Sequence, residues 1–521
     1  MYARHPVLRF VLRAELVAIL VALLVHGLVT DAGSRPPHTF VHIGAPSYAF
    51  VNVTRKVGLP EDLTRSWGST FVDYNRDGWP DLLVGRHLSP PWVYENHGGS
   101  FRLVIQHDLR YAPPGRPYYD RHACAWGSAG SGGRSDLYCV SGAQKGRGTG
   151  PNELLVQRSH GRLQDVARRD HVVDLYGRGR TINWLDYDGD GLLDMYVGNE
   201  KRAGYPNRLF HRSEDGFDDV PSATRSELAT RAVACADWNR DGTPDLLVVA
   251  HGGRGAVAFA NRSGTYAQVD LPYISGRRWM SATWGDFNGD GWNDLALTKA
   301  TRIVVFRNDK GTLHRVYVRP LVEGRSAAWL DVDNDGDLDL FIVQGASGEL
   351  GGINHRDVLL IHGNRGFTHA PGTSFAGPRD GNGDSVSTAD FDRDGRVDLF
   401  ITNGYEESEG RLQLRGPVEL LRNVSSAGHW IELALKGNVN NPYAYGAQVE
   451  VKTPDLDYRR EITDGVDFKS QSEVDPVHLG IGGAALAHIV VVWPDGQRDC
   501  FPAHANEQIA VTEGVSPCLP R

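Results

Sequence analysis

A short acidic motif recurs along most of the chain and constrains its fold more than any other feature. Six segments follow the pattern Asp-x-Asp/Asn-x-Asp-Gly-x-x-Asp and continue directly into an apolar run, as in "DVDNDGDLDLFIV" from Asp331 to Val343. A seventh segment, "SAGSGGRSDLYCV" at Ser128, keeps only the last acid, Asp136. The starts lie at 73, 128, 186, 237, 286, 331 and 390, so the steps are 45 to 59 residues. Self-similarity at such a period predicts a repeat architecture.

Each repeat supplies about four short strands. Apolar runs flank every acidic loop, and a second element with two short strands around a Gly-containing turn follows, as in "VVFRNDKGTL" from Val304. No strong 3.6-residue periodicity appears between Val51 and Asn423, so we expect few helices. Seven four-stranded units in series predict an all-β fold, a seven-bladed β-propeller that closes on itself. An open solenoid is the alternative.

The phase of the repeat indicates how the ring closes. The last copy of the second element, "ELLRN" at Glu419–Asn423, lacks the strand that follows it in the other copies. A matching strand without a neighbour, "FVNVT" at Phe50–Thr54, precedes the first repeat. We therefore expect the N-terminal strand to complete the last unit.

The acidic loops have the composition of a hard-cation site. Side chains at positions one, three, five and nine supply oxygen atoms, Gly at six permits a sharp turn, and the carbonyl at seven adds an oxygen. An all-oxygen cage of this size suits Ca²⁺. An EF-hand would need Glu at position twelve, where the chain has Ile342 and Val84, and an apolar strand replaces the exiting helix. A solvated acidic turn without metal is the plainer interpretation.

The predicted metal ligands share these four positions in the six intact loops. They are Asp73, Asn75, Asp77 and Asp81; Asp186, Asp188, Asp190 and Asp194; Asp237, Asn239, Asp241 and Asp245; Asp286, Asn288, Asp290 and Asp294; Asp331, Asp333, Asp335 and Asp339; and Asp390, Asp392, Asp394 and Asp398. About six structural Ca²⁺ ions are expected, and they would more than offset the formal net charge of −9. That charge, without a basic block, makes nucleic acid an unfavourable partner.

The cysteines predict two disulfides. Cys124 lies four residues before the degenerate loop and Cys139 three after Asp136, so the two face each other across a hairpin. We expect a bond that staples the unit that lost its metal; two buried thiols are the alternative. Cys500 and Cys518 could tie the last strands to the tail, and Cys235 is left over.

The first 30 residues read as an export signal. Basic residues precede an apolar stretch from Leu16 to Thr30, which fits either a cleaved signal peptide or a short membrane anchor. Either would place the rest of the chain outside the cell or on the outer face of its membrane, where disulfides form. We divide the chain into this segment (1–30), a linker (31–45), the propeller (46–425) and a β domain (426–521).

The C-terminal region leaves the repeat. "HWIELAL", "GAQVEVKT", "HIVVVWPDGQRDCF" and "EQIAVTEG" are strand-like runs, which predict a small β-sandwich. "NPYAYGAQVEV" (Asn441–Val451), "VHLGIG" and "VVWPDGQ" resemble the ASPIC/UnbV domain, and the acidic repeats resemble FG-GAP/VCBS repeats of integrin α chains. Together they resemble the cartilage acidic protein family and its bacterial relatives. In the ASPIC/UnbV domain a Gly-rich turn usually precedes the dipeptide "SQ". The stretch "TDGVDFKSQS" (Thr463–Ser472) departs from this turn, so a role tied to the turn does not carry over to this chain.

The resemblance implies a calcium-binding extracellular propeller that acts in adhesion, recognition or scaffolding, with an unidentified protein or glycan partner. We find no GxSxG, HExxH or P-loop motif and name no catalytic residue. His122, His251 and His478 lack metal-ligand spacing, and Trp126, Trp184, Trp238 and Trp284 beside the loops are expected to pack between units. The alternative is an enzyme or accessory subunit that acts on polysaccharide or in enediyne-type natural-product biosynthesis.

Overall fold

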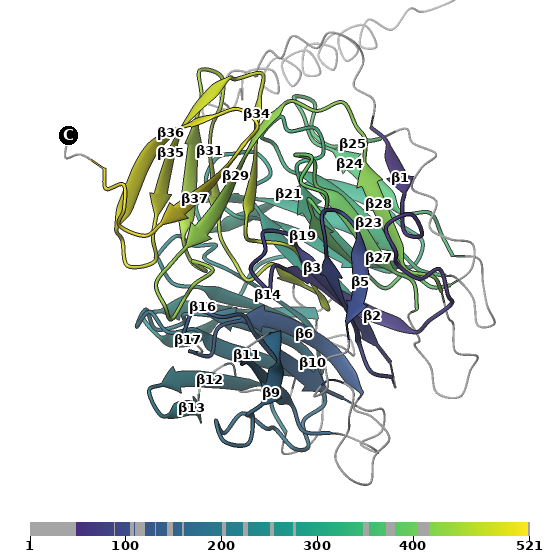
Figure 1. Ribbon diagram of the computed structural model, residues 1–521, viewed down its shortest axis with the longest axis vertical. Coiled ribbons are helices and arrows are strands. Elements are labelled where there is room, and N and C mark those ends of the chain that lie inside the picture. The colour runs from purple at the N-terminus through teal and green to yellow at the C-terminus, as the bar shows by residue number, and fades with distance from the viewer. Residues whose placement is uncertain are drawn as a thin grey trace, which may run out of the picture. The chain divides into compact units, whose positions relative to one another are not determined.

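The computed structural model describes residues 48–518, apart from 88, 105–108, 110–119, 131, 143–149, 159–160, 201–204, 222–223, 225–227, 251–254, 275–277, 347–353, 371–380 and 405–415. Every secondary-structure element in the described part is a β-strand, so the predicted all-β class is confirmed (Figure 1). Among these residues no helix has the length and apolarity needed to cross a membrane. The predicted export segment, Leu16 to Thr30, lies outside the described residues.

The acidic repeats form sets of four antiparallel strands, and the first set belongs to a larger sheet. The first three are β2 (Ser66–Val72), β3 (Asp81–Arg86), β4 (Trp92–Asn96) and β5 (Phe101–Val104); β6 (Arg121–Gly127), β7 (Asp136–Ser141), β8 (Glu153–Gln157) and β9 (Leu163–Asp165); and β10 (Gly179–Leu185), β11 (Asp194–Asn199), β12 (Arg208–Ser213) and β13 (Gly216–Asp219). The next three are β14 (Thr230–Ala236), β15 (Asp245–Ala250), β16 (Gly255–Arg262) and β17 (Thr265–Val269); β18 (Ser281–Gly285), β19 (Asp294–Lys299), β20 (Arg302–Asp309) and β21 (Thr312–Pro320); and β22 (Gly324–Leu330), β23 (Asp339–Gln344), β24 (Val358–Ile361) and β25 (Thr368–His369).

The remaining sheet of this kind joins the two ends of the repeat region. It contains β26 (Ser385–Ala389), β27 (Asp398–Thr402), β28 (Glu419–Asn423) and β1 (Phe50–Asn52). Phe50 pairs with Asn423 and Asn52 with Leu421, so the pairing expected from the phase of the repeat is confirmed. The first strand of each sheet lies beside the first strand of the next, and β26 lies beside β2. This closed succession of four-stranded sheets is consistent with a β-propeller.

The cores of these sheets lie between neighbouring repeats. One cluster combines Leu247 and Val249 of β15 with Leu295 and Leu297 of β19, and others join adjacent sheets in the same way. The predicted packing role of the tryptophans agrees with this pattern. Trp126 and Trp184 are almost fully buried, and the Trp184 indole donates to the carbonyl of Ala125 in the preceding sheet. Trp238 stacks on Trp284 of the next sheet, with ring centroids 5.4 Å apart.

Residues 429–512 form two further sheets. One is β34 (Val477–Gly482), β29 (His429–Lys436) and β37 (Glu507–Thr512), in which β29 and β37 run parallel. The other is β31 (Asp457–Glu461), β30 (Gln448–Lys452), β35 (Leu486–Val492) and β36 (Arg498–His504). The structure contains both expected disulfides, Cys124–Cys139 between paired strands β6 and β7, and Cys500–Cys518 between β36 and the tail.

A short hairpin of the C-terminal region leaves these two sheets and joins the repeat sheets. It consists of β32 (Val466–Asp467) and β33 (Ser470–Gln471), and β33 pairs in parallel with β2 through Thr70 and Gln471. The hairpin also contacts the first strands β6, β14, β18, β22 and β26. We call residues 461–473, which include it, the inserted segment.

Candidate functional site: acidic loops and the inserted segment

The acidic loops are shaped by bonds from their own backbone to the first aspartate. In the loop that starts at Asp331, the two carboxylate oxygens of Asp331 accept hydrogen bonds from the backbone N–H groups of Asp335, at 3.1 Å, and Gly336, at 2.9 Å. The loops at 73, 237, 286 and 390 repeat this arrangement, and the loop at 186 uses the N–H groups of Gly189 and Gly191. Gly336 has a φ of 93°, in the left-handed region, as the sharp turn predicted at position six requires.

The last aspartate of each loop ties the loop to the third strand of its sheet. Asp339 accepts the N–H of Val332 within the loop, at 3.0 Å, and the N–H of His362 beyond β24, at 2.8 Å. The degenerate loop keeps both bonds, because Asp136 accepts from Ala129 and from Gln157. This backbone tie explains why the seventh copy retains its last acid although it lost the others.

The predicted ligands come together in two loops. One oxygen each from Asp331, Asp333 and Asp339 lie within 4.8 Å of one another, and the same holds for Asp186, Asp188 and Asp194. Burial raises the pKa of Asp331 to about 7, with a further contribution from the charge of Asp333. Burial likewise raises the pKa of Asp194 to about 9. Without a cation, these carboxylates repel one another in surroundings that solvate them poorly.

The predicted ligands of the other four intact loops occupy the same register. Burial raises the pKa of Asp81 and of Asp245 to about 8, and one oxygen of each is buried without a hydrogen bond from the described residues. In the loop at 390, Arg422 lies 2.7 Å from both Asp392 and Asp394, so a guanidinium already neutralises part of that loop. The donor set is oxygen in every loop, which fits a hard divalent cation such as Ca²⁺.

The degenerate loop contains the guanidinium of an arginine from the neighbouring sheet, a contact that the sequence did not indicate. Arg212 of β12 donates from Nη1 to the carbonyl of Ser128, at 3.2 Å, and it is 8 % exposed. A Cβ on Gly130 would lie 2.1 Å from its Nη2, so the guanidinium occupies the space of the side chain missing at position three. The charge of Asp136 acts on this guanidinium. Arginine thus substitutes here for the cation that the carboxylates of the other loops could hold.

The inserted segment binds the ends of the first strands of the repeat sheets. Its side chains accept backbone N–H groups from five sheets: Ser470 from Ser69, Gln471 from Trp126, Asp464 from Trp184, Glu461 from Asp237, and Ser472 and Glu473 from Thr388 and Asp390. Apart from β2, which pairs with β33, no first strand in the described residues has a strand on its inner edge, so these side chains satisfy backbone N–H groups there. "TDGVDFKSQS", the stretch that departs from the family pattern, therefore has a structural role.

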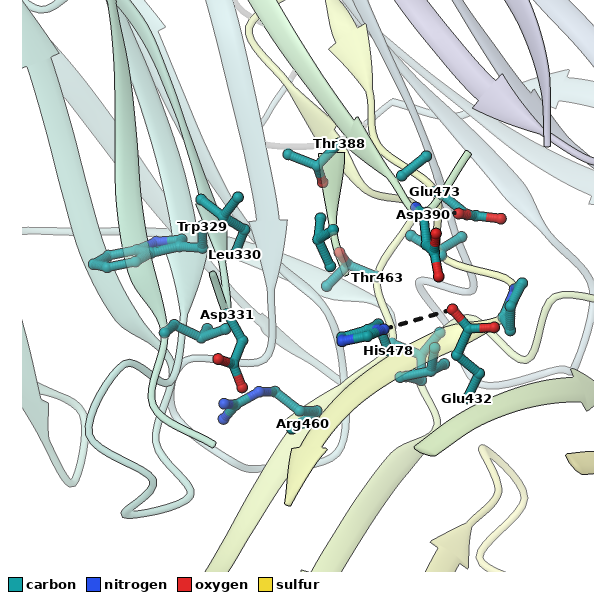
Figure 2. Close-up of a pocket in the computed structure, with 18 of the residues that line it drawn as sticks. Trp329, Leu330, Asp331, Thr388, Asp390, Glu432, Arg460, Thr463, Glu473 and His478 are labelled. Carbon is teal, nitrogen blue, oxygen red and sulfur yellow. Dashed lines mark hydrogen bonds and ion pairs between the residues drawn. The ribbon is translucent and has the colours of Figure 1, made fainter. Parts of the chain in front are cut away.

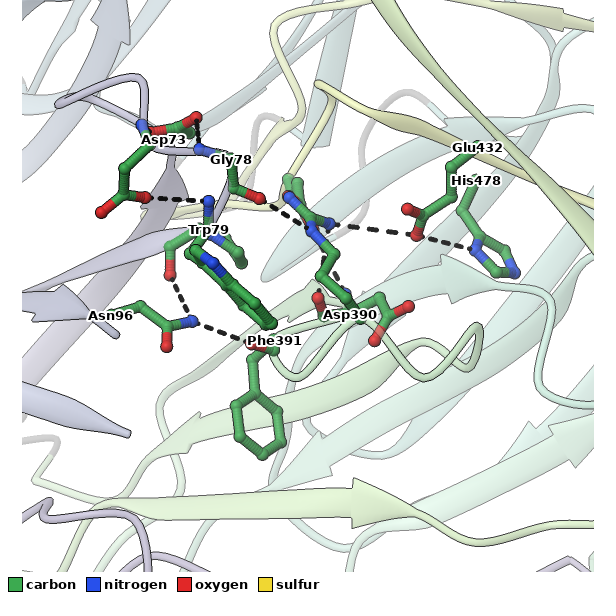
Figure 3. A network of polar contacts seen from close by, with 12 residues as sticks. Asp73, Gly78, Trp79, Asn96, Asp390, Phe391, Glu432 and His478 are labelled. Atoms are coloured by element: carbon green, nitrogen blue, oxygen red, sulfur yellow. Dashed lines mark hydrogen bonds and ion pairs between the residues drawn. The ribbon is translucent and has the colours of Figure 1, made fainter. Parts of the chain in front are cut away.

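Charged side chains extend this contact to the acidic loops. Arg460 donates to the carbonyls of Asp286, at 3.0 Å, and Gly336, at 2.6 Å. Arg393, at position four of the last loop, donates to the carbonyl of Gly78 in the first loop and to Glu473. Figure 3 shows how this network runs from Asp73 and Gly78 to Glu432 and His478. Arg393 thus links the loops at the two ends of the repeat directly, and it joins both to the C-terminal region through Glu473.

Two cavities flank residues 461–463. The first, about 200 Å³, is lined by Asp331, Asp390, Glu432, Glu473 and His478 among others (Figure 2). Burial lowers the pKa of His478, but its hydrogen bond with Glu432 and the charge of that carboxylate more than offset this, so the pKa is raised. The second cavity, about 330 Å³, lies against Asp186, Asp237, Tyr445 and Trp493.

The histidines singled out in the sequence have structural partners. His122 is buried and contacts Asp120, which also lies 2.8 Å from His87. His478 contacts Asn334 through Nε2, at 2.8 Å, and Glu432 through Nδ1, at 3.5 Å. His251 lies outside the described residues. These partners are up to 144 positions away in the sequence, which is why spacing alone did not reveal them.

Sequence comparisons agree with this division of the chain. The family described as "FG-GAP-like repeat" matches residues 186–248, 237–297, 286–342 and 331–401, and "ASPIC and UnbV" matches residues 437–517. The chain contains FG-GAP-like repeats and an ASPIC and UnbV domain. Each FG-GAP-like match begins at the first aspartate of an acidic loop.

Similar proteins cover most of the chain. Cartilage acidic protein 1 of Mus musculus is 24% identical over 90% of this chain and 77% of its own length. The protein of the same name from Xenopus tropicalis is 26% identical over 86% of this chain and 74% of its own length. The crystal structure titled BBS1N in complex with ARL6DN, soaked with mercury, covers 72% of this chain and 97% of its own at 8% identity, with a TM-score of 0.43, and we base nothing on it.

Proposed function

We propose that the protein is an exported calcium-binding module for adhesion, recognition or scaffolding. Its repeat sheets constitute a seven-bladed propeller over residues 46–425, and residues 426–521 form a β-sandwich domain whose inserted segment fastens it to the propeller. The observation that carries the proposal is the gathering of carboxylates in loops with a common backbone cage, as in Asp331, Asp333 and Asp339. About six Ca²⁺ ions would bind in the intact loops at the predicted positions one, three, five and nine.

Calcium in these loops would have a structural role. Each loop joins the first two strands of a sheet, and its last aspartate reaches the third strand, so a bound cation would fix three strands at once. The charge of the ion would also remove the mutual repulsion of the buried carboxylates. A cation held between strands in this way serves the scaffold and not a reaction.

Export is supported by the two disulfides, since such bonds persist in oxidising compartments. The similarity to cartilage acidic protein 1, together with the FG-GAP-like repeats, supports a place outside the cell. Residues 1–30 would direct the chain there as a cleaved signal or as a membrane anchor. The partner would be a protein or a glycan.

Three acids of the inserted segment serve as structural hydrogen-bond acceptors. Glu461, Asp464 and Glu473 each accept at least one backbone N–H of a repeat sheet, so they act as fixed hydrogen-bond acceptors. A general acid or base needs a proton that exchanges with a substrate. The enzymatic alternative would require catalytic activity on a polysaccharide or a natural-product intermediate.

The test of the proposal is capture of partners by the purified protein in Ca²⁺ and in EDTA, with glycan arrays and extracellular protein fractions as the two sources. The expected result is a partner that binds only in Ca²⁺. Equal binding of a partner in Ca²⁺ and in EDTA would show that recognition does not depend on calcium. Hydrolysis or cleavage of a glycan would instead support the enzymatic alternative.

A further inference from the structure

The loop from Asp186 to Asp194 has an imidazole beside two of its predicted metal ligands. His211 of β12 places Nδ1 3.3 Å from Asp188 Oδ2 and 3.3 Å from Asp194 Oδ1. This nitrogen is itself buried and has no hydrogen-bond partner of acceptable geometry, whereas 28 % of the side chain is exposed. Two overlapping groups of possible ligand atoms meet here, Asp186–Asp188–Asp194 and Asp188–Asp190–His211. The loop therefore offers one nitrogen and several oxygens to a common space.

The position of His211 is equivalent in all seven sheets, because the next residue donates its N–H to the last aspartate of the loop. The residues at this position are Glu95, Val156, His211, Ala260, Arg307, Ile361 and Arg422. Among these seven, His211 alone supplies a neutral nitrogen with a lone pair. The difference lies in the sequence of one strand, while the loop itself, "DYDGDGLLD", is as regular as the others.

We propose that the loop from Asp186 to Asp194 is a mixed nitrogen–oxygen site that selects a borderline transition metal such as Zn²⁺ over Ca²⁺. Imidazole suits Zn²⁺ and its neighbours, whereas Ca²⁺ prefers oxygen ligands alone. The ligands are His211 Nδ1, Asp188 and Asp194, with Asp186 or Asp190 as the fourth. This inference rests on the proposal that the acidic loops hold cations.

The separations of the ligand atoms are compatible with a tetrahedral ion. Two ligand atoms about 2.1 Å from a Zn²⁺ ion and 3.3 Å apart subtend an angle of roughly 105° at the metal, close to the tetrahedral value. At the longer Ca²⁺ distance, about 2.4 Å, the same separation gives an angle of roughly 87°, which a Ca²⁺ ion with six to eight ligands also accepts. The preference for Zn²⁺ therefore rests on the imidazole nitrogen. Both carboxylate contacts of the imidazole therefore fit a tetrahedral ion without movement of β12.

The surroundings hold the imidazole in place. The N–H of Arg212, the next residue, is bonded to Asp194 at 2.8 Å, so the strand and the loop cannot separate without breaking that bond. The Tyr187 ring packs edge-on to the imidazole, with ring centroids 5.8 Å apart. Pre-positioned ligands of this kind favour one coordination geometry over others.

The experiment titrates metal-free protein with Co²⁺, a spectroscopic substitute for Zn²⁺, in excess Ca²⁺. The expected result is one Co²⁺ per chain with visible d–d absorption, displaced by Zn²⁺. His211→Ala should weaken Co²⁺ binding by roughly tenfold or more, and His211→Asp, which leaves only oxygen donors, should weaken Co²⁺ binding while keeping that of Ca²⁺. His314→Ala, which removes an exposed imidazole from β21, should change nothing.

The outcomes separate this inference from the calcium proposal. Protein that binds Ca²⁺ but takes up no Co²⁺ in its presence overturns the inference alone, because His211 is then only an ion-pair partner of the two aspartates. The same conclusion follows if His211→Ala, verified as folded by circular dichroism, binds Co²⁺ as tightly as the unchanged protein. Protein that binds neither ion overturns the calcium proposal as well.

Discussion

Gln471→Ala tests whether the inserted segment fastens the C-terminal region to the repeat sheets. The Gln471 side chain is 2 % exposed and accepts the N–H of Trp126 at 2.7 Å. Its amide donates to the carbonyls of Trp126, at 3.0 Å, and Asp464, at 2.9 Å. The Trp126 carbonyl keeps a bond from the Tyr445 hydroxyl after truncation, so the Trp126 N–H and the Asp464 carbonyl would lose a partner.

The magnitude follows from these two groups. An unsatisfied buried polar group costs about 1–3 kcal/mol, so the loss of partners for two such groups should lower the free energy of unfolding by roughly 2–6 kcal/mol. Urea denaturation in Ca²⁺, followed by tryptophan fluorescence, measures this change. Gln497→Ala is the matched control, because Gln497 is exposed and its side chain bonds only Asp495 among the contacts described here. The control should change stability by less than about 0.5 kcal/mol. A Gln471→Ala effect as small as the control would refute the fastening role.

Three other perturbations test separate parts of the structure. Replacing Cys124 and Cys139 together by Ala should lower the free energy of unfolding by about 3 kcal/mol, measured in urea; no loss would mean that the bond does not stabilise its sheet. Arg212→Met should destabilise the protein equally in Ca²⁺ and in EDTA, since its loop uses a guanidinium; a defect that excess Ca²⁺ repairs would contradict this role. In EDTA, thermal unfolding scans should show that stability falls as the pH rises from about 4 to about 9. In the folded protein the pKa values of Asp81 and Asp245 are raised to about 8 and that of Asp194 to about 9, whereas an unfolded aspartate has a pKa near 3.9. The folded state therefore binds more protons than the unfolded state across this range, and deprotonation destabilises it. Ca²⁺ should therefore stabilise more at pH 8 than at pH 5, and a constant gap would count against unpaired carboxylates in the loops.

The regular features of the sequence predicted much of the fold. The acidic loops gave the register of the sheets, since each loop ends where a second strand begins, as Asp339 begins β23. The pairing of Phe50 with Asn423 followed from a missing strand at one end and a surplus strand at the other. Cys124 and Cys139 were placed opposite each other by the same register.

Features that depend on single contacts between distant residues could not be predicted. The inserted segment has no alternating pattern, and its bonds reach residues such as Trp126, 345 positions away. Nothing in the sequence distinguishes Arg212 from other strand residues, yet its guanidinium lies in the loop of the preceding sheet. His211 likewise lies 23 positions from Asp188, outside any metal motif, and could have been noticed only by aligning the third strands of the repeats.

The central claim is that the acidic loops bind calcium, and equilibrium dialysis tests it most directly. Metal-free protein would be dialysed against Ca²⁺ as the sole divalent cation, its bound calcium measured by atomic spectroscopy, and its unfolding temperature compared with that in EDTA. We expect about six Ca²⁺ per chain and a higher unfolding temperature in Ca²⁺. No bound calcium, together with an unfolding temperature that EDTA leaves unchanged, would contradict the account.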